Sequence, residues 1–313
     1  MKPMIILTGP TAAGKTSLSI QLAKAVNGAV VSADSMQIYK KMNIGTAKIM
    51  PEEMEGIDHY LVDELDPGEE FHVARFQEMA KDALEQIYAK GQIPIIVGGT
   101  GFYIQALLYD IQFTDTKTDE SYRRELKQIA KEKGNHYLHE MLAEVDPKSA
   151  EAIHENNVKR VIRALEYYKE TGEPISEHNE RERMRTSPYH FVYFVLTHER
   201  SVLYDRINKR VDLMLGQGLV DEVKSLKSEG YDRNFVSMQG LGYKEILRYL
   251  DGEISLDEAV YILKRDTRHF AKRQLTWFGR ERSVIMIEKQ KFESDKAILD
   301  YMLEIIEDRG ILC

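Results

Sequence analysis

The sequence predicts an α/β protein: a parallel-sheet core with flanking helices and an inserted helical domain. Three observations support this fold class. A glycine-rich loop follows an apolar run at the N-terminus, apolar runs alternate with helical patterns over about the first hundred residues, and a long charged segment in the middle of the chain contains no convincing strand. The alternation is typical of parallel strands joined by helical crossovers.

The first element is a phosphate-binding loop. The apolar run Ile5–Leu7 leads into Gly-Pro-Thr-Ala-Ala-Gly-Lys-Thr, and a helical pattern follows. Its glycines let successive N–H groups point into one concavity, at the positive end of the next helix. A lysine for phosphate oxygens and a threonine hydroxyl for Mg²⁺ complete a P-loop. The predicted phosphate-binding residues are Gly9, Pro10, Thr11, Ala12, Ala13, Gly14, Lys15 and Thr16, with Thr16 as the metal ligand.

Further strands and helices follow in order. We expect strands at Ala29–Ser32 and Ile93–Val97 with a helix over Ala74–Tyr88 between them, and strands again at Phe191–Leu196 and Val284–Ile287. The expected organisation is a first core part at 1–112, a helical insertion at 113–190 and a second, mostly helical core part at 191–313. Within the insertion, helices are expected over Tyr122–Lys133 and Ala150–Glu170.

Composition limits the class of protein. The formal net charge of -8 argues against indiscriminate binding to polyanions. The single cysteine, Cys313, excludes an internal disulfide framework and a cysteine-based zinc site. No apolar run approaches the ~20 residues that a membrane span needs, and Met1-Lys-Pro leads straight into the first strand. We therefore expect a cytoplasmic protein that has no membrane partner.

One basic segment could bind nucleic acid locally. Lys264–Arg282 carries seven basic residues against two acidic ones, and Arg265, Arg268 and Lys272 share one face of a helix. A solvated charged face is the alternative explanation, and on this segment alone it is the better one.

Two loops at the carboxyl ends of predicted strands carry candidate chemistry. Asp34 follows the second strand, where it could cap a turn, hold Mg²⁺ through water or accept a proton. Gly98-Gly-Thr-Gly101 follows the strand at Ile93–Val97, where nucleotide hydrolases normally have an acidic Mg²⁺ ligand. Its N–H groups and the Thr100 hydroxyl could instead hold an oxyanion or a leaving group.

Two further patterns concern charge and nucleotide. Arg206 and Arg210 lie four residues apart on one helical face, and either could clamp phosphate, although a surface ion-pair helix with Asp205 and Asp212 is an even alternative. Thr116–Asp119 matches the short guanine-reading pattern of GTPases, but no clear strand precedes it, so we reject a GTPase assignment.

Six motifs occur in one order along the chain, and together they resemble the bacterial tRNA dimethylallyltransferases. They are Gly9–Thr16, Ala33-Asp-Ser-Met-Gln-Ile-Tyr39, Gly98-Gly-Thr-Gly-Phe-Tyr103, Arg206-Ile-x-x-Arg210-Val-Asp-x-Met214, Gly240-Leu-Gly-Tyr243 and Ala271-Lys-Arg-Gln-x-Thr-Trp277. The resemblance covers almost the whole chain, and six ordered motifs are far more specific than a P-loop alone.

The resemblance implies a reaction. The P-loop would hold the diphosphate of dimethylallyl diphosphate, and the prenyl group would pass to N6 of adenosine 37 in tRNAs that read codons beginning with U. Asp34 would be the general base, Thr100 would steady the leaving group, and Mg²⁺ near Thr16 would neutralise pyrophosphate. One of Arg206 and Arg210 would clamp the diphosphate, and we favour Arg206 slightly.

The resemblance also implies tRNA contacts. Adenosine 37 would be flipped out of the anticodon loop into the pocket, and the insertion would embrace the anticodon stem of a tRNA bound to a monomer. His269 stands where relatives often have another residue and is given no contact. The implied tRNA-binding residues are Asp34, Ser35, Met36, Gln37, Thr100, Lys159, Arg160, Val161, Ile162, Arg163, Gln239, Gly240, Leu241, Gly242, Tyr243, Lys244, Lys272, Arg273 and Gln274.

Two other functions compete with this interpretation. A small-molecule or nucleotide kinase would explain the P-loop and Asp34 but leaves the Gly98–Gly101 loop and the basic helix unexplained. A nucleotide switch or non-catalytic RNA-binding protein would bind GTP or RNA without turnover.

Overall fold

The computed structural model describes residues 1–113 and 120–312, and the chain divides into two compact units. The first unit joins Met1–Leu108 to the chain from Pro188 onward, and the second is Tyr109–Ser187, where the sequence predicted an insertion at 113–190. Each unit is described by itself. Neither the guanine-reading pattern at 116–119 nor Cys313 lies within the described residues.

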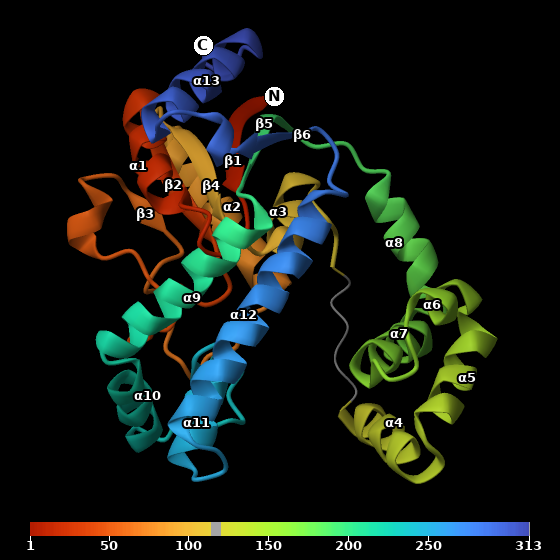
Figure 1. The fold of residues 1–313 in the computed structure, drawn as a ribbon. Helices are drawn as coiled ribbons and strands as arrows, with labels where there is room; N and C mark the ends of the chain where they lie inside the picture. The colour runs from red at the N-terminus through yellow and green to blue at the C-terminus, as the bar shows by residue number, and fades with distance from the viewer. Residues whose placement is uncertain (114–119, 313) are drawn as a thin grey trace. The chain divides into compact units, whose positions relative to one another are not determined.

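The core of the first unit is a six-stranded parallel sheet with the order β3-β2-β4-β1-β5-β6 (Figure 1). All strand pairs in it are parallel. The predicted parallel sheet is therefore confirmed, and the two-residue strand β3 is the one the sequence did not predict. The strands are β1 (Lys2–Thr8), β2 (Gly28–Ala33), β3 (His59–Tyr60), β4 (Ile93–Gly98), β5 (Tyr189–Thr197) and β6 (Val284–Glu288).

Helices cover both faces of this sheet, which explains why its central strands are apolar without alternation. Met4–Leu7 of β1 is fully buried. Ile5 and Leu7 share a core cluster with residues of α1 (Lys15–Ala25) and α13 (Asp295–Asp308) on one face. The helices α2 (Val73–Ala89) and α3 (Gly101–Leu108) lie against the other face (Figure 1). Short 3-10 turns η1 (Pro51–Met54), η2 (Ser237–Gln239) and η3 (Lys289–Lys291) complete this unit.

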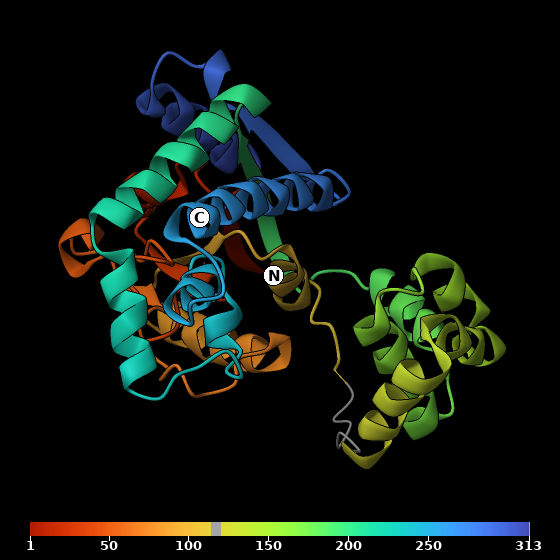
Figure 2. The ribbon, with the colours of Figure 1, turned by 60° about the horizontal axis from the view of Figure 1, so that its bottom comes forward.

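Four helices add a second layer to the first unit. They are α9 (Arg200–Gly216), α10 (Leu219–Ser228), α11 (Tyr243–Leu250) and α12 (Leu256–Phe278). The long helix α12 packs along α9 and α11, as Figures 1 and 2 both show. Gly218 and Gly242 precede α10 and α11 with φ of 99° and 95°, a left-handed conformation that side chains disfavour. Gly218 therefore separates α9 from α10, and Gly242 precedes the first residue of α11.

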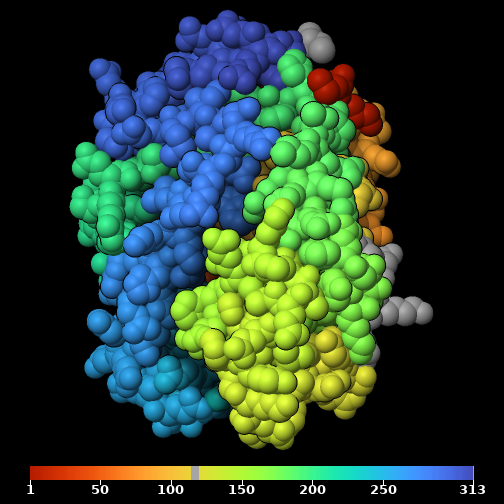
Figure 3. Space-filling model, turned by 90° about the vertical axis from the view of Figure 1, so that its right-hand side faces the viewer, coloured from red at the N-terminus to blue at the C-terminus, as the bar shows by residue number. Residues whose placement is uncertain are grey.

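The described residues of the second unit form five helices (yellow to green in Figure 3). A small apolar core that includes Leu126, Leu142 and Leu165 holds them together. The buried Glu166 accepts two hydrogen bonds from Arg123, at 2.7 and 2.8 Å. The helices are α4 (Glu120–Lys133), α5 (Asn135–Val145), α6 (Pro147–Ala152), α7 (Val158–Thr171) and α8 (Ile175–Arg183).

One predicted helix of this unit is wrong in extent. The sequence predicted a single helix over Ala150–Glu170, and the structure divides it into α6 and α7. A turn separates them, closed by a hydrogen bond from Asn157 N–H to the His154 carbonyl at 2.8 Å. Two consecutive asparagines favour such a turn, because their side chains compete for backbone hydrogen bonds.

Membrane insertion finds no support in the helices. None of those in the described ranges 1–113 and 120–312 is both long and apolar enough to cross a bilayer.

Candidate functional site

The P-loop joins β1 to α1 and curls around its own lysine. Gly9 and Gly14 have φ of 148° and 85°. A Cβ at Gly9 would lie 2.3 Å from the carbonyl oxygen of Leu196 in β5, so only glycine fits there. The ammonium group of Lys15 donates hydrogen bonds to the carbonyl oxygens of Gly9 and Pro10, at 3.0 and 2.9 Å. These two hydrogen bonds therefore hold the Lys15 ammonium group inside the loop.

Electrostatics at Lys15 favour a bound anion. Burial, together with the positive charge of Arg210, lowers the pKa of Lys15 to about 8, and the negative charge of Asp34 opposes this shift. The pKa of Arg210 is also lowered, again chiefly by burial. Two buried cations beside one carboxylate leave an excess of positive charge, which an anion such as a diphosphate would neutralise.

Asp34 directly follows β2 and caps a turn, one of the roles that the sequence left open. Its Oδ1 accepts hydrogen bonds from the N–H groups of Met36 and Gln37, at 2.8 and 3.4 Å, so it caps the turn that follows the strand. No described residue donates a hydrogen bond to Oδ2. Asp34 lines two adjoining cavities. One oxygen therefore orients the carboxylate, and the other is available to a ligand.

The Gly98–Gly101 loop contains glycine wherever another element comes close. A Cβ at Gly98 would lie 2.3 Å from the Ala33 carbonyl oxygen, and a Cβ at Gly101 would lie 2.2 Å from the Trp277 ring. The N–H of Thr100 donates to the Ala33 carbonyl at 3.2 Å, and Thr100 lines the same cavity as Asp34. The loop is thus packed tightly enough to place Thr100 beside the end of β2.

The two arginines of α9 face the P-loop and are not part of a surface ion-pair network. Asp205 pairs with Lys209 at 2.8 Å, and Asp212 pairs with Lys264 at 2.5 Å. Arg206 instead donates from Nε to the Ala12 carbonyl oxygen at 2.8 Å. Arg206 and Arg210 both line the P-loop cavity, and Arg210 also lines the second cavity. The ion-pair explanation therefore does not account for either arginine.

The two cavities differ in chemistry and meet at shared walls. Each has a volume of about 410 Å³. The first is lined by the P-loop, including Lys15 and Thr16. The second is lined by the 239–244 loop and by apolar residues of α9 and α12. The shared lining residues are Thr11, Asp34, Thr46, Gly99, Arg210, Phe270 and Gln274. A ligand with a phosphate end and an apolar end could therefore span both.

Gln274 bridges the two loops from α12. Its Oε1 accepts a hydrogen bond from the N–H of Thr11, and its Nε2 donates to the carbonyl oxygen of Gly99, both at 2.9 Å. The side chain is only 6% exposed, and a Cβ at Gly99 would lie 2.2 Å from its Nε2. The sequence predicted Gln274 as a tRNA contact, whereas the structure engages its amide with the protein. The tRNA contact of Gln274 remains a prediction, and the structure adds a bridging role that the sequence did not predict.

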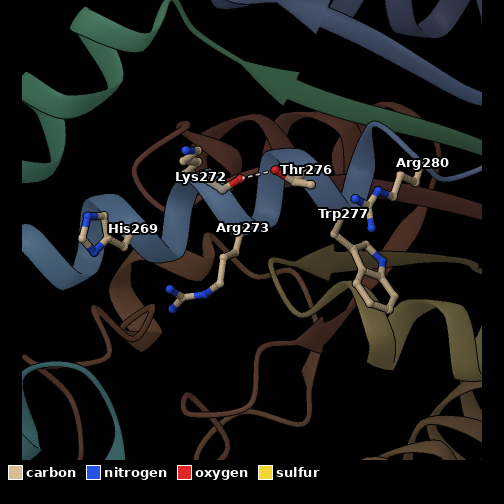
Figure 4. Close-up of a pocket in the computed structure, with 6 residues that line it drawn as sticks. All are labelled: His269, Lys272, Arg273, Thr276, Trp277 and Arg280. Atoms are coloured by element: carbon tan, nitrogen blue, oxygen red, sulfur yellow. Dashed lines mark hydrogen bonds between the residues drawn. The ribbon is translucent and has the colours of Figure 1, made fainter. Parts of the chain in front are cut away.

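A groove of about 440 Å³ runs along the outer face of α12 (Figure 4). Lys272 and Arg273 leave the helix in different directions in Figure 4, and Arg273 also lines the second cavity. His269, to which no contact was assigned from the sequence, lies in the same groove. The lining residues are His269, Lys272, Arg273, Thr276, Trp277 and Arg280. The basic segment therefore forms a concave surface that begins at the mouth of the second cavity.

The other predicted tRNA contacts divide into exposed and buried side chains. In α7, Lys159, Arg160 and Arg163 are exposed, whereas Val161 and Ile162 are 0% and 4% exposed in the core of the helical unit. The side chains of Val161 and Ile162 therefore pack inward. The predicted tRNA contact of these two residues stays a prediction. Ser35, Met36 and the residues Gln239, Gly240, Leu241, Gly242, Tyr243 and Lys244 line the second cavity, and Gln37 lines the first.

The residues near Thr16 fit a magnesium ion that is held mostly by water and by substrate phosphates. Thr16 and Asp34 line the P-loop cavity together. The described residues contain no group of three or more His, Cys, Asp or Glu side chains arranged to hold a metal. Mg²⁺ commonly keeps several waters and binds through one or two protein oxygens and substrate phosphates. That mode of binding needs no cluster of acidic residues.

Some cavity residues were not predicted from the sequence. Gly45, Thr46 and Phe270 line the cavities, and Glu222 hydrogen bonds to the loop that carries Thr46. The small residues Gly45-Thr46, in the segment between β2 and η1, are the one signal that could have indicated a loop close to a ligand. Glu222 has no such signal, because its partners are distant in sequence.

Comparisons with known proteins agree on one family. A family model described as IPP transferase matches residues 37–281. A tRNA dimethylallyltransferase of Lachnoclostridium phytofermentans is 61% identical over 312 residues and covers 100% of both chains. The full-length tRNA isopentenylpyrophosphate transferase of Bacillus halodurans has a TM-score of 0.75 at 45% identity, over 99% of this chain and 98% of that chain.

A eukaryotic relative extends the comparison. The structure of a eukaryotic dimethylallyltransferase acting on tRNA has a TM-score of 0.82 at 31% identity, and the match covers 98% of this chain and 79% of that chain. The architecture is therefore shared with enzymes from distant sources.

The lowered pKa of Lys15 predicts a pH dependence of anion binding. Lys15 is mostly charged at about pH 7 and mostly neutral at about pH 9.5, and only the charged form attracts phosphate. The affinity of the full chain for inorganic pyrophosphate, measured by calorimetry, should therefore fall through about pH 8. Lys15→Met is the control, because it retains the titration of pyrophosphate itself. Parallel curves for the two proteins across this range would contradict the lowered pKa.

Proposed function

The chain belongs to the tRNA dimethylallyltransferase family of prenyltransferases, and we propose that it transfers the dimethylallyl group from dimethylallyl diphosphate to N6 of adenosine 37 in tRNAs reading codons that begin with U. Pyrophosphate is the second product. The observation that carries this proposal is the meeting of a phosphate-binding cavity and a partly apolar cavity at Asp34. The donor occupies the first cavity and extends into the second, where the acceptor base arrives.

The donor's diphosphate lies in the P-loop in this proposal. The loop N–H groups and Lys15 bind its oxygens, and Thr16 binds the accompanying Mg²⁺. When bound, Mg²⁺ neutralises charge on the departing pyrophosphate. Arg206 is tied to the P-loop at Ala12, which suits a clamp on the diphosphate. Arg210 lines both cavities and therefore suits the bridging oxygen, next to the carbon that reacts.

In this reaction both the N6 nucleophile and the diphosphate leaving group need assistance from the protein. N6 of adenine is a weak nucleophile because its lone pair is delocalised into the ring. As N6 attacks the allylic carbon, a new N–C bond forms and the C–O bond to diphosphate breaks. Asp34 takes the N6 proton on Oδ2, while Thr100 donates its hydroxyl hydrogen to the bridging oxygen of the leaving group. Apolar side chains such as Ile207 and Phe270 exclude water from the allylic carbon.

The acceptor reaches the second cavity as a single flipped nucleotide. A stacked base of the anticodon loop could not approach Asp34 at the carboxyl edge of the sheet, so extrusion of adenosine 37 is required. The groove on α12 binds the neighbouring phosphates through Lys272, Arg273 and Arg280. The exposed Lys159, Arg160 and Arg163 of the helical unit bind the anticodon stem. A monomer acting in the cytoplasm is sufficient for this arrangement.

The kinase alternative is disfavoured by the same site. The strand β4 ends in Gly98, and the loop after it offers N–H groups and a hydroxyl in place of an acidic Mg²⁺ ligand. Family membership supports prenyl transfer as well.

Labelled dimethylallyl diphosphate incubated with unmodified tRNA and the full chain tests the proposal directly. We expect Mg²⁺-dependent incorporation of one prenyl group per tRNA, located at adenosine 37 by nuclease digestion and mass spectrometry. A tRNA with guanosine at position 37 is the matched control and should remain unlabelled. Phosphorylation of a metabolite by ATP, without any prenylation of tRNA, would support the kinase instead.

Replacement of Asp34 separates catalysis from binding. Asp34→Asn keeps the size of the side chain and removes the base, so kcat should fall by about 10² to 10⁴, the usual contribution of a general base. The Kd for tRNA should change by less than about twofold. Asp82→Asn, at an exposed position on α2, is the control. If the Asp34 variant kept the wild-type rate constant in single-turnover assays, Asp34 would be disqualified as the base.

Replacement of Lys272 tests the groove on α12. Lys272→Ala should weaken tRNA binding and reduce the slope of log K against log salt concentration by about 0.7 to 0.9, because one phosphate contact is lost. Lys296→Ala, which removes an exposed lysine paired with Asp300 on α13, should leave the slope unchanged. Fluorescence titrations at several salt concentrations give both values. An unaltered slope in the Lys272 variant would show that this face of α12 is a solvated surface that does not contact phosphate.

A further inference from the structure

Glu222, in the first turn of α10, collects four hydrogen bonds that the proposed reaction does not explain. Its Oε2 accepts from the N–H groups of Asn43 and Ile44, at 2.9 and 2.7 Å. Its Oε1 accepts from the N–H of Gly45 at 3.0 Å and from the hydroxyl of Tyr243 at 2.7 Å. One side chain therefore joins α10, the loop at residues 43–47 and the start of α11.

The 43–47 loop forms part of the wall of the site. Gly45 lines the second cavity, and Thr46 lines both cavities together with Asp34. The amide of Gln37 donates to the carbonyl oxygens of Thr46 and Ala47, at 3.3 and 3.1 Å. A displacement of the 43–47 loop would therefore move Gln37 and change the volume available to the acceptor base.

The same hydrogen-bond path continues to the proposed base. The N–H of Gln37 donates to Oδ1 of Asp34, next to the stronger bond from Met36. Glu222 thus connects to Asp34 through the 43–47 loop and Gln37, although Glu222 does not line either cavity.

A carboxylate suits this position better than any neutral side chain. Three consecutive N–H groups converge on it, an arrangement that favours an anion. Tyr243 supplies the fourth donor, and its buried ring lies so close to Gly45 that a Cβ there would be 2.6 Å from it. Burial raises the pKa of the Tyr243 hydroxyl, as do the charge and hydrogen bond of Glu222, so this hydroxyl remains a donor. Without the carboxylate, three backbone donors would lose their partner.

We propose that Glu222 is a positioning residue for the transfer reaction: by holding the 43–47 loop, it fixes the acceptor cavity and the orientation of Asp34 within it. This inference rests on the proposed function. Glu222 acts through the loop and touches neither substrate. Replacement of Glu222 should therefore change kcat and the binding of the acceptor more than it changes the binding of the diphosphate, which the P-loop supplies.

The chain contains a matched control for this role. Glu229, at the other end of α10, pairs with Lys41 at 2.6 Å just before the same loop, and both side chains are exposed. An exposed pair of this kind contributes little. Comparison of Glu222 with Glu229 therefore separates the convergent hydrogen bonds from the mere presence of an acid between α10 and the loop.

The experiment compares Glu222→Gln, Glu222→Ala and Glu229→Gln in the full chain with tRNA and dimethylallyl diphosphate. We expect kcat to fall about tenfold in Glu222→Gln, which keeps one acceptor oxygen, and about a hundredfold in Glu222→Ala. The KM for dimethylallyl diphosphate should remain within about twofold of wild type. Glu229→Gln should match wild type in both parameters. Rates are normalised to the fraction of folded, pyrophosphate-binding protein.

A local readout in Glu222→Gln distinguishes positioning from simple loss of structure. Hydrogen exchange of the peptide over residues 40–48 should accelerate in the same variant and remain unchanged in Glu229→Gln.

Defined outcomes overturn the inference. Wild-type kcat in Glu222→Gln would show that the anchor does not position the site. A loss of rate that is fully explained by a smaller folded fraction would show a structural role only. If the wild-type chain itself does not prenylate tRNA, the proposed function fails. Exchange over residues 40–48 then still decides whether Glu222 holds the loop.

Discussion

The two hydrogen bonds of Gln274 are the constraint on which the rest of the site depends. They tie α12 to the P-loop at Thr11 and to the β4 loop at Gly99, two backbone segments that contribute different parts of one cavity. The bridge leaves no room for a side chain at Gly99. Because α12 also carries the basic groove, the surface proposed to bind RNA and the loops proposed to hold the leaving group belong to one rigid arrangement.

The charges of the site follow from what that arrangement buries. Lys15 and Arg210 lie in a cavity where burial lowers the pKa of each, and Asp34 is the nearby carboxylate that offsets them. An acidic residue at the end of β4 would neutralise this excess of positive charge. Gly98 at that position preserves it, which suits a diphosphate that gains negative charge as it leaves. The absence of an acidic residue at the end of β4 and the burial of two cations therefore both keep this cavity positively charged.

Local patterns in the sequence predicted what local structure determines. The strand Ile5–Leu7, the P-loop and the helix after it need only neighbouring residues, and all three are confirmed. The bridge between Gln274 and Thr11 spans 263 positions, so its amide could be assigned only a generic role from sequence. The burial of Val161 and Ile162 illustrates a related limit of a sequence motif. A motif gives a continuous run, whereas helical geometry turns two of its members into the core.

Asp34 illustrates why two explanations of one residue need not compete. Turn capping and proton acceptance use different oxygens, and the capping bonds at Oδ1 restrict the rotation that Oδ2 would otherwise have. A base that must meet a flipped nucleotide benefits from that restriction, because an oriented acceptor loses less freedom when the nitrogen arrives. The turn that Asp34 caps is in turn held through Gln37 by the 43–47 loop. The structural role is therefore the physical condition for the proposed catalytic one.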